Sequence, residues 1–176
     1  REAGEGEQVM ADKFRPMLVL TGSVVRQSKP RVVYGGHRRV GVPVGYVYND
    51  QNGLHTSRDH LCEAMPPLSS WGKYFIAKNF GRSEGDLMRV LASMDSTVIK
   101  INGQVWGQPL MAREYRDTII SQSNVVSDNI FGVETSNPSL VGMIAHTEIK
   151  FGNGDPFLAI IPPLDQTYHE YTYFIS

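Results

Sequence analysis

The chain has 176 residues, of which 41% are hydrophobic and 20% are charged, and this composition is typical of a folded globular protein and excludes a disordered one. Its 17 Lys and Arg residues against 18 Asp and Glu residues give a formal net charge of -1, so the overall basic excess of a nucleic-acid-binding protein is absent. We therefore predict no nucleic-acid partner. No apolar run approaches the roughly 20 residues of a membrane-spanning helix, so we also predict no membrane insertion by this segment.

The sequence up to residue 13 has no apolar periodicity, and we predict a linker or a disordered end there. It starts with an acidic, glycine-rich stretch, from which we expect a fragment of a longer protein. From residue 14 onward, short β-rich runs alternate with Gly, Pro, Asn and Asp, as in a sandwich or a barrel. We therefore predict an all-β fold with few or no helices, and strands over residues 17–20, 31–34, 42–48, 73–76, 97–101, 130–133, 140–144, 157–161 and 171–175.

Three Asn-Gly pairs, which begin at Asn52, Asn102 and Asn153, predict tight hairpins because both residue types tolerate positive φ angles. The pair at Asn102 is the strongest, since apolar and polar residues alternate over residues 97–101 before it and the chain turns into residues 104–106 after it. One stretch has a competing pattern, because Leu and Met residues within 87–94 fall at helical spacing. Its short length and the turn that follows favour a strand over residues 87–93.

An internal repeat is the most specific sign of organisation. Residues 25–33 align with residues 133–141 at a shift of 108 around a shared Ser-x-Pro, and residues 59–68 align with residues 155–164 at a shift of 96 around a shared Pro-Pro-Leu. Proline cannot donate a ladder hydrogen bond, so each copy should have one strand that breaks at Ser-x-Pro, a second strand, and a third that ends at Pro-Pro. We predict two packed, antiparallel, β-sandwich-like halves, residues 14–86 and residues 87–176, that form one unit.

One motif indicates catalysis. Residues 81–85 match the G-x-S-x-G elbow around Ser83, and Asp155 and His169 follow in the order of a triad. That elbow needs parallel strands joined by helical crossovers, whereas the sequence offers at most one candidate helix. We therefore interpret residues 81–85 as a turn and predict that the protein is not an enzyme.

A partial calcium-loop pattern over residues 48–59 is the nearest approach to a metal site. Four residues fit template positions 3, 5, 6 and 12: Asp50, Asn52, Gly53 and Asp59. The first position holds Tyr48 in place of an acid, and His60 with Cys62 on one strand face is only half a zinc site. We predict no metal and no other cofactor.

Four segments share the pattern of one known family. They are residues 28–36 (Ser-Lys-Pro-Arg-Val-Val-Tyr-Gly-Gly), residues 59–73 (Asp-His-Leu-Cys-Glu-Ala-Met-Pro-Pro-Leu-Ser-Ser-Trp-Gly-Lys), residues 89–93 leading to 97–103, and residues 155–163. With them the chain resembles the IgGFc-binding-protein N-terminal domain family over nearly its whole length after Val25. The resemblance implies an extracellular, non-enzymatic β domain of a mucin-like, secreted or cell-surface protein, and a strand over residues 89–93.

The chain departs from that family pattern at one pair of positions. The family usually places a cysteine just before Asp-His-Leu and its partner near a Ser-Gly-Asn turn, where this chain has Arg58 and the region of His37. The customary disulfide is therefore absent, and we expect the single cysteine, Cys62, to be a buried free thiol. No residue identifies an antibody site.

We predict a non-catalytic extracellular binding or structural module of a larger adhesive, matrix or mucin-like protein, with protein or glycan partners that include other domains of the same chain or copies of itself. The long loop over residues 37–58 is the best contact region, although covering a sheet edge is an equal alternative role. Candidate contact residues are His37, Arg38, Arg39, Tyr46, Tyr48, Trp71 and Trp106. The alternatives are a carbohydrate-binding module that stacks sugars on Trp71, Tyr74 and Trp106, a serine hydrolase that uses Ser83, and an architectural spacer.

Overall fold

The computed structural model describes residues 20–26, 28–29, 31–42, 58–82, 85–121, 126, 128–147 and 155–167, and the backbone alone of residues 48–50 and 53–55. Within these residues every regular element is a β-strand or a single turn of 3-10 helix, the latter at η1 (Leu68–Ser70) and η3 (Leu164–Gln166). The predicted all-β class is confirmed. No helix in the described part of the chain is long and apolar enough to cross a membrane.

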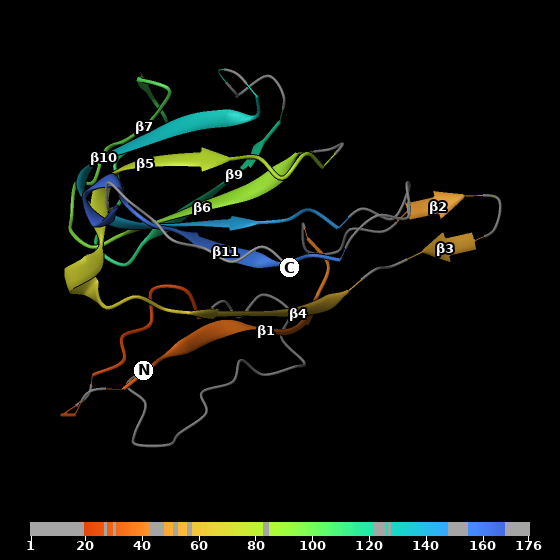
Figure 1. Cartoon of the computed structure of the whole chain (residues 1–176), viewed down its shortest axis with the longest axis horizontal. Helices are drawn as coiled ribbons and strands as arrows, with labels where there is room; N and C mark the ends of the chain where they lie inside the picture. Colours follow the sequence, from red (N-terminus) through yellow and green to blue (C-terminus); the bar gives the residue numbers. More distant parts are fainter. Residues whose placement is uncertain are drawn as a thin grey trace.

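Seven antiparallel strands form the main sheet: β5 (Gly72–Lys78), β6 (Asp86–Ala92), β7 (Ile99–Ile101), β8 (Gln104–Val105), β9 (Tyr115–Ile120), β10 (Ile130–Ile144) and β11 (Leu158–Ile161). Strand β10 is 15 residues long and runs through the centre. One edge of β10 pairs with β7 and then β6, and the other edge pairs with β5 and then β11. Strand β8 pairs with β7 and β9 pairs with β6, and the whole sheet curls into a half-barrel (Figure 1).

Two hairpins complete the described fold: β1 (Tyr34–Val40) with β4 (Asp59–Ala64), and β2 (Tyr48–Asp50) with β3 (Gly53–His55). The β2–β3 hairpin projects away from the main sheet, while β1–β4 lies along it (Figure 1). Leu61 and Val42 pack with Ile144 at the end of β10 in a small second apolar cluster. The Val42 amide donates to Thr147 Oγ1 and its carbonyl accepts from the Thr147 amide, both at 2.9 Å. These contacts attach the β1–β4 hairpin to the main sheet.

The main core lies on the concave face of the curled sheet and contains Phe75, Ala77, Met88, Val90, Ala92, Ile99, Leu110, Ile120, Phe131, Val133, Val141 and Met143. Burial alternates strictly along β6, as expected for a strand with one covered face. The prediction of a strand over residues 87–93 is therefore confirmed, because a period of two buries Met88, Val90 and Ala92 together. Fully burying a side chain such as Met88 or Val90 contributes roughly 1.5–3 kcal/mol, and the smaller Ala92 contributes less.

The hairpin predicted at Asn102 is also confirmed. Strands β7 and β8 pair as Lys100 with Val105 and Ile101 with Gln104. Asn102 and Gly103 between them have φ angles of 49° and 80°, which is the left-handed conformation of a type I′ turn. Strand β5 likewise covers the predicted segment 73–76, and β11 covers the predicted segment 157–161 except for its first residue.

Other predicted boundaries are wrong. Segments 130–133 and 140–144 belong to one continuous strand, β10, in which Ser136 and Pro138 form an irregularity of register rather than a break. The segment 31–34 is not a strand, since β1 begins at Tyr34. Strand β9 was not predicted at all. Residues 17–19, 43–47 and 171–175 lie outside the described residues.

Half of the predicted repeat has a local counterpart. Strand β11 ends directly before a Pro-Pro pair and β4 ends one residue before one, and each pair continues into a 3-10 turn, η3 or η1. In contrast, residues 31–33 form no strand while the aligned residues 139–141 lie in β10. Two equivalent halves and a division between residues 86 and 87 remain predictions. The predicted division falls inside β6, and β5 and β6 both pair with β10.

Candidate functional site

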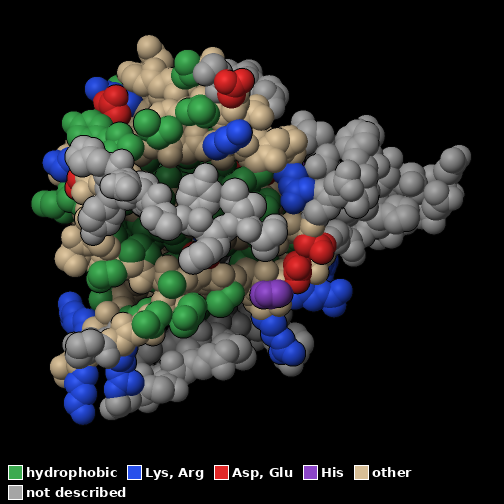
Figure 2. All heavy atoms as spheres, in the orientation of Figure 1, with side chains coloured by type: hydrophobic (Ala, Val, Ile, Leu, Met, Phe, Trp, Pro, Cys, Tyr) green, Lys and Arg blue, Asp and Glu red, His purple; other side chains and the backbone are tan. Residues whose placement is uncertain are grey.

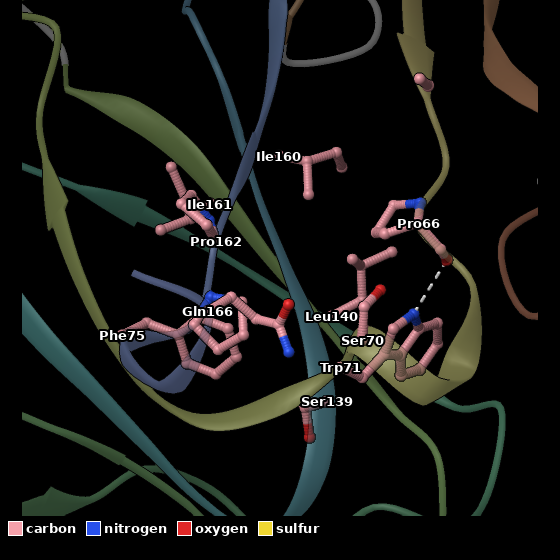
Figure 3. A pocket seen from close by; sticks show the side chains of 12 residues that line it. Pro66, Ser70, Trp71, Phe75, Ser139, Leu140, Ile160, Ile161, Pro162 and Gln166 are labelled. Atoms are coloured by element: carbon pink, nitrogen blue, oxygen red, sulfur yellow. Dashed lines mark hydrogen bonds between the residues drawn. The ribbon is translucent and has the colours of Figure 1, made fainter. Parts of the chain in front are cut away.

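A groove of about 200 Å³ opens where the ends of β4 and β11 meet the start of β5. It is lined by Ala64, Pro66, Ser70, Trp71, Phe75, Ser139, Leu140, Ile160, Ile161, Pro162, Pro163 and Gln166. Figure 3 shows Ile161, Pro162 and Gln166 on one side of it and Pro66 and Trp71 on the other. Segments far apart in the sequence therefore supply its two walls.

The two walls are built in the same way. Each begins at a strand end that cannot continue, because the Pro-Pro pair supplies no amide for a ladder. Pro67 and Pro163 both have extended backbone, with φ angles of -64° and -70° and a ψ angle of 154°. The next residue starts a 3-10 turn, which brings Ser70 into one wall and Gln166 into the other. Two short stiff corners thus face each other across the groove.

Trp71 and Gly72 fix how the walls meet. The Trp71 indole Nε1 donates to the Pro66 carbonyl at 3.2 Å, so the ring is held in one orientation while it lines the groove. Gly72 begins β5 directly under the other wall, since a Cβ added there would lie 2.2 Å from the Pro163 side chain. Any larger residue at this position would push Pro163 outward.

The chemistry of the groove is almost entirely apolar. The Ser70 hydroxyl donates to the Pro67 carbonyl at 2.8 Å, and the Ser139 hydroxyl donates to the Asn137 carbonyl at 3.0 Å. Gln166 is exposed, and its side-chain amide is the one polar group of the lining without a hydrogen bond to another described residue. No acid, histidine or cysteine lines the groove, so it suits binding of an apolar ligand rather than proton transfer.

The predicted contact residues fall in different places. Trp71 lines the groove, whereas the Trp106 ring packs against the main core and lies 5.3 Å from the Arg116 guanidinium. His37, Arg38 and Arg39 are exposed on the β1–β4 hairpin, far along the chain from the groove. Tyr46 and the side chain of Tyr48 lie outside the described residues, although the backbone of Tyr48 begins β2.

The predicted loop over residues 37–58 is wrong over its described part. Residues 37–40 complete β1, and residues 48–50 and 53–55 form the β2–β3 hairpin. The strand forms because its partner β4 is available to pair, which sequence spacing does not reveal. The turn that we predicted at Asn52 falls between β2 and β3, but Asn52 itself lies outside the described residues.

The G-x-S-x-G motif connects two strands that each pair antiparallel with β10. It joins β5 to β6, whereas a nucleophile elbow joins a strand to a helix. Its two glycines have a backbone role, since Gly81 and Gly85 have φ angles of 82° and 84°. Ser83 and His169 lie outside the described residues, and Asp155 is exposed.

The expectation of a buried thiol is wrong, because Cys62 is exposed on β4. Across the hairpin it faces Gly36, which has no side chain to cover it. Among the described residues, no group of three or more His, Cys, Asp and Glu side chains is arranged to hold a metal ion. Asp59 of the calcium-loop pattern is engaged by its neighbour His60, whose ring Nδ1 lies 2.9 Å from Asp59 Oδ1.

Asp86 is the fully buried carboxylate at the start of β6. Its Oδ2 accepts from the Phe80 amide at 2.7 Å and its Oδ1 from the His146 amide at 3.1 Å. Burial nevertheless raises the pKa of Asp86 above its ordinary value of 3.8, against the opposing effect of these two hydrogen bonds. The native protein therefore holds this proton more tightly than the unfolded chain.

Because the pKa of Asp86 is raised in the native protein, its contribution to stability should be lost as the pH rises. The contribution of Asp86 to the free energy of unfolding is greatest below pH 3.8, falls as the pH rises through its raised native pKa, and is constant above it. Each unit of pKa difference corresponds to about 1.4 kcal/mol. Urea unfolding of the wild type and of Asp86→Asn across this pH range measures the effect. The stability of the wild type relative to the variant should decrease with rising pH, and an increase would contradict the assignment.

The groove was not foreseen as a unit. Sequence reasoning singled out Trp71 as a contact residue and both Pro-Pro pairs as strand ends, but it gave Pro163 and Gln166 no place in a site. The signal that could have found them is the recurrence of Pro-Pro-Leu after two separate strands. Two Pro-Pro turns that each follow a strand can form the two walls of one groove when the two strands lie side by side in the fold.

Comparison with known proteins gives one family. Residues 13–176 match the family model described as IgGFc binding protein. No curated protein and no solved structure shows a match. The family match covers nearly all of the chain, including both walls of the groove and the β1–β4 hairpin.

Proposed function

This chain belongs to the IgGFc binding protein family, and we propose that it is a non-catalytic binding module of a larger extracellular protein. Its partner is a protein, and its recognition site is the groove between the two Pro-Pro corners. The observation that carries the proposal is the lining of that groove, with the Trp71 ring held by its hydrogen bond to Pro66 on one wall and Pro162 and Pro163 on the other wall (Figure 3).

The lining favours an extended, proline-containing segment as the ligand. Grooves lined by aromatic rings bind polyproline-type segments because such segments are already extended and lose little conformational entropy on binding. The Trp71 indole N–H is engaged by the Pro66 carbonyl, so the ring contributes its face. The Gln166 amide remains to donate to one carbonyl of the ligand. Such a ligand needs mainly apolar contact and a single polar contact, which is what the groove offers.

A binding function agrees with the family description, which names binding and not a reaction. That description names the antibody Fc region as a ligand, and no described residue of this chain identifies a binding site for it. The extracellular setting and a role in adhesion, matrix or mucus are part of the proposal. In such a setting the proline-containing segment comes from a neighbouring protein, from another domain of the same chain or from a second copy of it.

Titration with an oligoproline peptide tests the proposal. The chain has two tryptophans, Trp71 and Trp106, so two indole N–H signals are expected in a spectrum of the ¹⁵N-labelled protein. The peptide should shift the signal of Trp71 and leave that of Trp106 in place, because Trp106 is covered by Arg116. Replacing Trp71 by alanine should abolish the binding.

Tyr74→Ala is the matched control, since Tyr74 follows closely on β5 but its ring is exposed outside the groove. This variant should bind the peptide as the wild type does. An unchanged Trp71 signal at saturating peptide would disprove the proposed ligand. If a cello-oligosaccharide shifted the Trp71 signal and oligoproline did not, the carbohydrate-binding alternative would replace it.

A further inference from the structure

Basic residues are unevenly distributed along this nearly neutral chain. Residues 13–49 contain seven Lys and Arg residues and one His, and not a single Asp or Glu. The described part of this segment leads into and forms β1, the outer strand of the β1–β4 hairpin. Figure 2 shows Lys and Arg side chains gathered on the side of the molecule where Figure 1 places this hairpin.

Three arginines and a histidine meet at one end of the hairpin. His37, Arg38 and Arg39 are successive exposed residues, and the register of β1 shifts between His37 and Val40. This bulge is where consecutive side chains can point to the same side. The Arg39 amide donates to His37 Nδ1 at 3.0 Å, which orders the bulge. Val40 pairs with Asp59, so Arg58 lies beside the same end of the hairpin.

We name this group the basic bulge; it consists of His37, Arg38, Arg39 and Arg58. Its three arginines are available to a ligand. All three arginine side chains are exposed, and none of them is paired with a carboxylate of the described residues. Asp59, which follows Arg58 in the chain, is engaged by the backbone amide and ring of His60. Those hydrogen bonds lower the pKa of Asp59, so it remains a charged partner of His60.

We propose that the basic bulge binds a sulfated polysaccharide. A guanidinium group presents parallel N–H donors that match the oxygens of a sulfate ester, and three of them on one hairpin end match a polymer that repeats its anionic groups. Along a strand, residues advance by about 3.3 Å each, so the exposed face of β1 offers a track for several sugar units. This site is separate from the groove and takes a different ligand.

A sulfated glycan fits better than a nucleic acid. The formal net charge of the whole chain is -1. The surface outside the basic bulge therefore offers no overall attraction to a long, densely charged duplex. Sulfated polysaccharides are the abundant polyanions of the extracellular space, and this part of the argument rests on the extracellular setting of the proposed function. The groove and its peptide ligand are not needed for it.

Heparin is the probe for the test, with binding measured by calorimetry at low and at physiological salt. The wild type should bind heparin with an affinity that falls as salt rises, because binding releases counterions. The double variant Arg38→Ser/Arg39→Ser should bind about tenfold or more weakly, with a salt slope reduced by about two units. Arg58→Ser, which lies outside the strand, should weaken binding independently of any effect on β1.

The matched control is Lys73→Ser/Lys78→Ser, which removes the same charge from two exposed positions of β5 and should bind heparin as the wild type does. Trp71→Ala should also keep heparin binding, so a failure of the groove proposal and a failure of this one give different results. Equal loss in the two double variants would overturn the proposal. Equal binding of de-sulfated heparin or of duplex DNA would overturn the choice of sulfated glycan.

Discussion

Replacing Phe131 by alanine is expected to lower the free energy of unfolding by about 3–5 kcal/mol. Phe131 is 1% exposed and lies in the part of β10 that pairs with β5, directly opposite Ala77. Its ring fills the concave side of the curled sheet together with Phe75. The rigid surroundings cannot collapse onto the lost volume, because strands on both edges hold β10 in place.

Ile130→Ala is the control for this prediction, because Ile130 neighbours Phe131 on the same strand but points outward and is 39% exposed. It should cost about 1 kcal/mol or less. Chemical unfolding followed by tryptophan fluorescence measures both variants. Similar losses in the two would mean that the core does not lie on the side of β10 that Phe131 faces.

The second large effect is expected at the turn between β5 and β6. Gly85→Ala should lower the free energy of unfolding by about 2–5 kcal/mol. Gly85 has a φ angle of 84°, which is costly for alanine, and a Cβ there would lie 2.5 Å from the carbonyl oxygen of Ile120 on β9. Because that neighbour is backbone in a paired strand, the clash cannot be relieved by a side-chain rotation.

Gly81 in the same turn provides a matched comparison. Its φ angle is 82°, but an added Cβ would meet nothing within 4 Å. Gly81→Ala should therefore cost only the backbone strain of about 1–2 kcal/mol. Thermal and urea unfolding of the two variants isolate the steric part as their difference. If Gly81→Ala were the more damaging of the two, the turn would be packed differently and the motif would regain interest as a functional element.

Local signals in the sequence predicted the parts of the fold that depend on local structure. The β7–β8 hairpin follows from the positive φ angles that Asn102 and Gly103 accept. Strand β6 could be predicted because the segment between the two turns that flank it is short for a helix. Strand β10 was predicted in two pieces because Pro138 reads as a strand breaker, whereas its position at the register irregularity opposite β5 makes a proline acceptable there.

The part of β1 over residues 37–40 was predicted as a loop because the glycines before it gave no strand signal. Gly35 and Gly36 have low β propensity, yet Gly36 is needed because it lacks a side chain. A Cβ at this position would lie 1.8 Å from the Leu61 carbonyl oxygen, so only glycine lets β4 approach this closely. Such a requirement concerns a residue 25 positions further along the chain, and local spacing does not contain it.

Part of the candidate site could be predicted and part could not. Trp71 was identified from its aromatic character next to a Pro-Pro pair, and His37, Arg38 and Arg39 were identified as contact candidates of a loop, although they lie in β1. The groove itself depends on Pro66 and Pro163 meeting in space. Their proximity arises because β4 packs beside β11 while β5 and β11 both pair with β10, and neither segment contains this arrangement by itself.

The central position of β10 has a consequence for the way the protein is made. Strands β5, β6 and β7 precede β10 in the chain, yet all three find their main partner in it. Until residues 130–144 have left the ribosome, these earlier strands keep open edges and an uncovered apolar face. A chain interrupted before residue 130 is therefore expected to be prone to aggregation, and the emergence of β10 is the step that allows the domain to close.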